Sequence, residues 1–210
     1  MGGWNGRTCR AGCVRRHVTI LPPGIFRWRA RRGWNGWVDE ELRWELLARR
    51  DEDQRVRQLV SAPKGQYVAR LPDEVATEWQ RVDEENTRWL GELLATRGWP
   101  GRTPVGEDGA QAAWLLAQHA DHDPDLQRIF LGALRAAAAA GEASPAHAAY
   151  LEDRVRVHTG QLQLYGTQFT VTGGEFGPFP IEDPQRLDER RAEAGLEPFA
   201  AYQARMRAGS

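Results

Sequence analysis

Two histidines alternate with aspartates in the segment QHADHD, which runs from Gln118 to Asp123. His119 and His122 are three positions apart, so both lie on one face if the segment continues a helix. Two imidazoles beside carboxylates suit a divalent metal ion. In a second interpretation, His119 is a general base and a neighbouring Asp orients its other ring nitrogen. We take His119 and Asp121 as the catalytic candidates.

The same segment also has a purely structural interpretation. Asp123 precedes Pro124, and this pair is typical of a helix N-cap followed by a proline in the first turn. A histidine at a helix C-terminus is favoured by the helix dipole without any catalysis. Both interpretations stay open on the sequence alone.

A metal centre needs more ligands than this segment offers. The motif resembles a His-Asp metal phosphohydrolase signature, and such sites draw further His and Asp from separate helices. The other histidines of the expected folded region are His147 and His158, both downstream of His119. Because this ligand count is low, we expect no metal site, and the sequence names no cofactor.

Further polar motifs, LEDR at 151–154 and YGTQ at 165–168, follow the histidine segment. Gly166 lies in a strand-like stretch, where glycine weakens a strand and marks a bulge or a close backbone approach that a ligand would explain. We hypothesise that these motifs and His119 surround one pocket for a small molecule or a peptide. The candidate ligand-binding residues are Gln118, His122, Glu152, Arg154, Tyr165 and Gln168.

Several reaction classes lack their usual residues. Cys9 and Cys13 precede the expected folded region, and the chain has no Gly-x-Ser-x-Gly elbow. It also has no phosphate-binding loop and no dinucleotide fingerprint. An enzyme with this sequence would therefore be hydrolytic, activating water, or would transfer a proton. The alternative is a non-catalytic helical interaction module, a regulator or immunity-type partner, in which the polar motifs only tie helices together.

The motifs GWPGRTPVGEDGAQAAWLL, QHADHD, YLEDRV, YGTQ and PIEDPQRLDERRAEAGLEP occur in this order. Together they resemble an uncharacterised bacterial family, catalogued as a domain of unknown function, from about Glu41 to Met206. The resemblance implies a domain boundary and supports the candidate positions in QHAD, LEDR and YGTQ. It implies no reaction.

Hydrophobic periodicity and capping residues predict a mainly α fold. The expected elements are about six or seven helices in one compact domain at 38–208, with a small β-hairpin near the C-terminal third. We expect a break near Arg50 in the first helix. We expect the hairpin strands at Leu162–Val171 and Phe176–Ile181. The expected helical segments are 38–62, 73–98, 110–120, 124–140, 146–157, 184–195 and 198–206.

Residues 1–37 differ in composition from the rest of the chain. Eight arginines and no acidic residue precede Asp39, so we interpret this segment as a disordered or loosely attached basic leader. Contact with nucleic acid is expected, if at all, only through this leader. The partner of the folded region would be a small molecule or a protein. Two cysteines, abundant arginine and the lack of a long apolar run favour a bacterial cytoplasmic protein without a membrane segment.

Overall fold

The computed structural model describes residues 38–59 and 72–209, so the basic leader and most of the loop expected at 62–72 lie outside the described residues. Within the described part, the predicted mainly α fold with one small hairpin is confirmed. The elements in chain order are α1 (Glu40–Gln58), α2 (Asp73–Arg97), α3 (Arg102–Gln118), α4 (Pro124–Ala139), α5 (Pro145–His158), β1 (Phe169–Thr172), β2 (Glu175–Pro178), the 3-10 helix η1 (Pro184–Arg186), α6 (Leu187–Glu193) and α7 (Phe199–Gly209).

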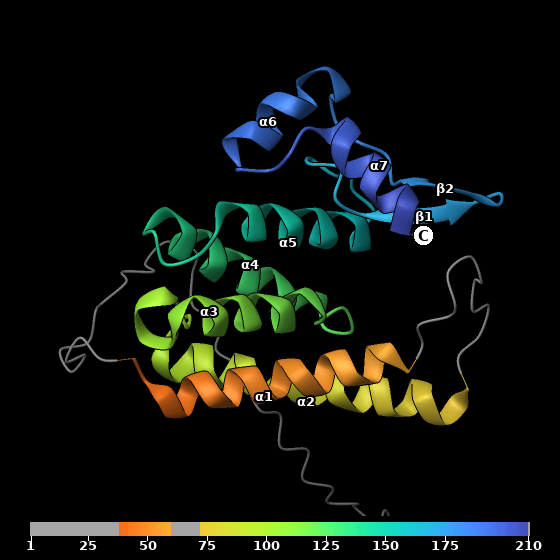
Figure 1. Ribbon diagram of the computed structural model, residues 1–210. Coiled ribbons are helices and arrows are strands. Elements are labelled where there is room, and N and C mark those ends of the chain that lie inside the picture. The colour runs from red at the N-terminus through yellow and green to blue at the C-terminus, as the bar shows by residue number, and fades with distance from the viewer. Residues whose placement is uncertain (1–37, 60–71, 210) are drawn as a thin grey trace, which may run out of the picture. The chain divides into compact units, whose positions relative to one another are not determined.

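Helix α3 packs against α1, α2, α4 and α5 (Figure 1). Its inner positions are small, and Ala112, Ala113 and Ala117 are fully buried. Small side chains let the neighbouring helices approach closely, which explains how one helix contacts four others. Gly106 interrupts the helix with a φ of 73°, a left-handed conformation that favours glycine. The regular part of α3 therefore begins at Glu107, close to the expected start.

Helix α1 is continuous, and the break expected near Arg50 is absent. The inward positions Leu42, Leu46, Arg49, Asp53 and Val56 follow steps of four and three residues. Two of these five side chains are charged, so the middle of the inward face of α1 is polar. The helix continues because both charged side chains have partners on the facing helices α2 and α3.

Helix ends agree with the capping residues in part. The carboxylate of Asp123 accepts a hydrogen bond from the Leu126 amide at 3.0 Å, as expected for the N-cap of α4. Ser144 precedes α5, but its hydroxyl makes no capping hydrogen bond. Pro72 holds the N-cap position of α2, and Asp73 is the first residue of that helix.

The β-hairpin is shorter than expected. Strands β1 and β2 pair antiparallel across Gly173-Gly174, with Phe169 opposite Pro178. The first strand begins at Phe169 and not at Leu162, because the preceding residues wrap around a carboxylate of α5 instead of pairing with a strand. In the described part of the chain, no helix combines the length and hydrophobicity needed to cross a membrane.

Candidate functional site

The imidazole of His119 lies against Asp53 of α1. His119 follows the last residue of α3, and its Nδ1 is 2.9 and 3.1 Å from the two carboxylate oxygens of Asp53. A carboxylate only accepts hydrogen bonds, so the pair places the proton on Nδ1 and leaves Nε2 as the basic nitrogen. Asp53 is fully buried, whereas the His119 side chain keeps 14% of its surface exposed. The pair has the geometry of an oriented general base.

Further charged groups extend this pair toward α2. Arg57 forms an ion pair with Asp53 at 3.0 Å and donates two hydrogen bonds to Asp83 at 3.0 and 3.2 Å. The indole of Trp79 also donates to Asp83, at 2.8 Å, and the Arg57 guanidinium lies over its ring. Burial raises the pKa of the Asp83 carboxyl above its usual value, although the charge and hydrogen bonds of Arg57 lower it. We call these five residues, Asp53, Arg57, Trp79, Asp83 and His119, the α1–α3 cluster.

Asp121 belongs to a different group, at the turn before α4. Arg154 of α5 donates through Nε at 2.8 Å and also through Nη2, and Gln127 donates at 3.0 Å. The Nδ1 of His158 lies 3.2 Å from the same carboxylate. Burial acts to raise the pKa of Asp121, but the hydrogen bonds from His158 and Arg154 outweigh burial and hold this pKa well below its usual range. Arg154 also donates to the amide oxygen of Gln168 at 3.3 Å.

The YGTQ motif is organised by a carboxylate that we did not single out. Asp153 is fully buried on α5 and accepts hydrogen bonds from the amides of Leu164, Tyr165 and Thr167 and from the Thr167 hydroxyl. Burial raises the pKa of Asp153, against the lowering effect of these hydrogen bonds. The loop therefore has internal partners for the amides that a ligand could otherwise bind.

Gly166 is explained without a ligand. Its φ is 68°, and a Cβ at this position would lie 2.7 Å from Cε2 of Phe199 on α7. Tyr202 of α7 donates to the carbonyl oxygen of Thr167 at 3.0 Å, and the fully buried Arg191 donates to that of Tyr165 at 2.5 Å. The close backbone approach expected at Gly166 is thus an approach to α7.

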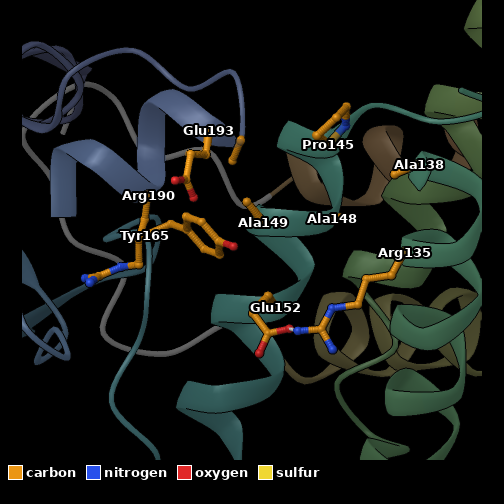
Figure 2. A pocket seen from close by; sticks show the side chains of 10 residues that line it. Arg135, Ala138, Pro145, Ala148, Ala149, Glu152, Tyr165, Arg190 and Glu193 are labelled. Atoms are coloured by element: carbon orange, nitrogen blue, oxygen red, sulfur yellow. Dashed lines mark hydrogen bonds and ion pairs between the residues drawn. The ribbon is translucent and has the colours of Figure 1, made fainter. Parts of the chain in front are cut away.

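A pocket of about 240 Å³ lies between α4, α5 and α6 (Figure 2). Alanines and Pro145 make up half of its lining residues. The other half are the polar or charged residues Glu152, Tyr165, Arg135, Arg190 and Glu193. Arg135 donates to the Glu152 carboxylate. Burial raises the pKa of the Tyr165 phenol, and the negative charges of Glu152 and Asp153 raise it further.

The structure distributes the candidate residues over three places. His119 lies in the α1–α3 cluster. Asp121, Arg154 and Gln168 form one hydrogen-bonded group, and Glu152 and Tyr165 line the pocket. Gln118 is buried, and its side-chain oxygen has no hydrogen-bond partner among the described residues. His122 is exposed. No hydrogen bond joins His119 to Gln168 within the described part of the chain: His119 bonds Asp53, and the Gln168 side chain bonds Arg154 and Thr167.

Sequence reasoning missed Asp53, Asp153, Arg135 and Glu193. Asp53 had a usable signal, since it lies on the inward stripe of α1 at heptad-like spacing from Leu46 and Val56. Arg135 is the charged residue in an alanine-rich stretch of α4. Glu193 carried no signal, because α6 is rich in charge throughout.

The described residues contain no group of three or more His, Cys, Asp or Glu side chains that could hold a metal ion. The His119 ring is turned toward Asp53 and His122 toward solvent, so the two histidines do not form a shared site.

The comparisons with known proteins identify the chain at the level of its family. Searches of curated proteins and of solved structures each returned no match. A family model matches residues 40–208, which is most of the chain and includes all three groups described above. The chain belongs to DUF6624, a family of unknown function.

Proposed function

We propose that this domain binds a small organic molecule in the pocket between α4, α5 and α6, with Glu152 and Tyr165 as the groups that recognise it. One observation carries the proposal: the Glu152 carboxylate, with only 9% of its side chain exposed, borders a pocket that also has apolar walls of alanines and Pro145. Ligand sites are typically concave and mostly apolar, with a few convergent polar groups. A nearly buried carboxylate at an open pocket has the chemistry of such a recognition group.

The test is a screen of small fragments of mixed charge, read by the thermal midpoint and by two-dimensional NMR. Binders should raise the midpoint and shift the amide signals of Ala148, Ala149 and Tyr165. Glu152→Gln and Tyr165→Phe should each weaken a binder by about tenfold, since each removes one hydrogen-bonding group. Glu189→Gln is the matched control, because Glu189 lies on α6, is exposed and does not line the pocket. If no fragment shifts these signals, the proposal fails and the interaction module is favoured.

A second candidate function is proton transfer at His119. The observation that favours it is the two-oxygen contact between Asp53 and Nδ1, which orients the ring and fixes the proton on Nδ1. Such a pair activates water or removes a proton from a bound substrate. The role of Asp121, by contrast, would be to hold Arg154 near Gln168 and not to orient His119.

Chromogenic esters, amides and phosphomonoesters test this second candidate. Any turnover should fall about a hundredfold or more in both His119→Ala and Asp53→Asn, because an Asn in place of the Asp favours the wrong tautomer. The exposed His122→Ala is the control and should keep full turnover. The thermal midpoint of each variant separates loss of catalysis from loss of folding. Equal turnover in the His119→Ala variant and the unchanged chain would remove His119 from the mechanism.

The cellular setting is also a proposal. We propose a bacterial cytoplasmic protein, supported by a composition of 27 arginines against one lysine and by only two cysteines. Localisation of a tagged chain in cell fractions tests it, and recovery in the membrane or extracellular fraction would contradict it.

A further inference from the structure

We propose that the ligand of this pocket is a compact organic cation with an amidinium, guanidinium or ammonium group, and that Arg135 occupies the cation position while the pocket is empty. This inference rests on the proposed function and names the ligand class of the same site.

The two partners of the ion pair differ in exposure. The side chain of Arg135 is 57% exposed, whereas that of Glu152 is 9% exposed. A carboxylate removed from water needs a cation or several hydrogen bonds to remain charged at low cost. Arg135 supplies that cation from the solvent side of α4 (Figure 2). No other hydrogen bond or ion pair holds its guanidinium within the described part of the chain, so it can leave without breaking a second contact.

The other arginines near the pocket are committed elsewhere. Arg156 lies 4.0 Å from Glu152, but it bonds the Leu162 carbonyl and the Glu182 carboxylate. Arg190 donates to the carbonyl oxygens of Leu164, Glu182 and Asp183, and in Figure 2 its guanidinium points away from the pocket. If Arg135 moved out, Glu152 would face the pocket with its charge poorly compensated.

The remaining polar groups of the pocket also favour a cation. Glu193 brings a second carboxylate to the rim, and the Tyr165 ring offers an aromatic face. Burial is the main cause of the raised pKa of Tyr165; the negative charges of Glu152 and Asp153 add to it, and Arg135 and Arg190 act against it, so carboxylate charge lies close to its hydroxyl. Alanines and Pro145 complete the walls, so the space suits a flat, compact group.

Three compounds of one shape and different charge test the inference: benzamidine, benzamide and benzoate. Benzamidinium presents two parallel N–H groups, like the Arg135 guanidinium, on an aromatic ring. We expect calorimetric titration of the full chain at neutral pH to show benzamidine binding at least about tenfold more tightly than benzamide, and no detectable benzoate binding. The NMR signals of Tyr165 and Ala149 should shift on binding.

Replacing Arg135, the cation that already pairs with Glu152, gives a sharper test than comparing the three compounds. Arg135→Gln should bind benzamidine about three- to tenfold more tightly than the unchanged chain, because no displacement is needed. Arg128→Gln is the matched control on the same helix. Arg128 is 52% exposed and paired with Asp125, and its replacement should change affinity by less than about twofold. If Arg135→Gln proves unstable, Glu193→Gln at the exposed rim should weaken benzamidine about threefold and leave benzamide unchanged.

The inference is overturned if benzoate binds as well as benzamidine, if Arg135→Gln weakens benzamidine, or if benzamidine binds neither chain. These results are distinct from failure of the proposed function. If a neutral or anionic fragment shifts the Tyr165 and Ala149 signals, the proposal that the pocket binds a small molecule stands, and only the proposal that its ligand is a cation fails.

Discussion

The carboxylate of Asp153 shows how a single buried residue can account for a motif that looks designed for a ligand. Its oxygens accept from three backbone amides and one hydroxyl of the YGTQ loop. Gln163, also fully buried, donates to the carbonyls of Gln168 and Phe179 and accepts from the Gln168 amide. The polar groups of the loop that already bond Asp153 or Gln163 are not available to bind a substrate.

Gly166 gives a stability prediction at the residue scale. Gly166→Ala combines a left-handed backbone with a contact of 2.7 Å to Phe199, and it should lower the free energy of unfolding by about 2–5 kcal/mol. Gly160 has a similar φ of 73° but open space around its Cβ position, so Gly160→Ala should cost only about 1–2 kcal/mol. Urea unfolding of both variants measures the difference. Equal costs would mean that the Phe199 contact does not constrain position 166.

The depressed pKa of Asp121 predicts a pH dependence. Its hydrogen bonds from His158 and Arg154 outweigh burial, so the folded pKa lies below the unfolded value of about 3.9. Stability from such a group is complete above the unfolded pKa and is lost as the pH falls toward the folded pKa. At pH 7, Asp121→Asn should cost about 1–2 kcal/mol, a figure reduced for screening because the side chain is 36% exposed.

Urea unfolding between pH 7 and pH 3 tests this dependence. The difference between the unchanged chain and Asp121→Asn should narrow below about pH 4. Asp125→Asn, at a carboxylate 89% exposed, is the control and should show almost no difference at any pH. A difference for Asp121→Asn that stays constant with pH would show that the charge of Asp121 is not what stabilises the fold.

His119 illustrates what could be predicted about the candidate groups and what could not. The sequence indicated that this histidine would have a carboxylate partner, but the nearest aspartates in the chain suggested Asp121. The partner is Asp53, 66 residues earlier, because the end of α3 faces α1. Spacing along one segment tells which side chains share a face, and it does not tell which other helix that face meets.

At the scale of elements, helix α1 stays continuous through its polar middle because the charged side chains there have partners on neighbouring elements. Arg49 donates to Asn86 at 3.2 Å, and its guanidinium lies over the Trp89 ring. Together with Asp53 and Arg57, it forms a row of charged groups that each face a partner on α2 or α3. Helices were predictable here because caps and apolar spacing are local signals. The start of β1 was not, since it depends on Asp153 of another element.

The caps of α4 and α5 give a prediction at this scale. Asp123→Ala removes a side-chain oxygen that accepts from the Leu126 amide and should cost about 1 kcal/mol. Ser144 has the same position before α5 and also precedes a proline, but its hydroxyl makes no capping bond. Ser144→Ala should therefore cost less than about 0.5 kcal/mol. Thermal unfolding of the two variants measures both stability losses. A loss for Ser144→Ala as large as that for Asp123→Ala would contradict the conclusion that only Asp123 caps its helix through its side chain.

At the scale of the whole molecule, the polar groups lie at the surfaces where helical pairs meet. The α1–α3 cluster joins three helices, the Asp121 group joins the turn before α4 to α5 and the YGTQ loop, and the pocket opens between α4, α5 and α6. The alanine-rich α3 brings these helices together through small buried side chains. Its polar groups near the N-terminal end, such as Asp108, which pairs with Arg43 of α1, lie outside these three groups. Close packing and the candidate sites therefore depend on the same helix.

Two deletions test which parts of the chain this arrangement requires. We propose a domain boundary near residue 38, since the family model begins at residue 40 and the helical core draws on residues from Leu42 onward. A chain lacking residues 1–37 should keep its thermal midpoint within about 2 °C. A chain ending before Leu187 loses Arg191 and Tyr202, which bond the carbonyls of Tyr165 and Thr167, and its midpoint should fall by about 10 °C or more. A large fall for the first deletion would place the boundary earlier. No fall for the second would show that the hydrogen bonds of Asp153 and Gln163 are enough to hold the YGTQ loop.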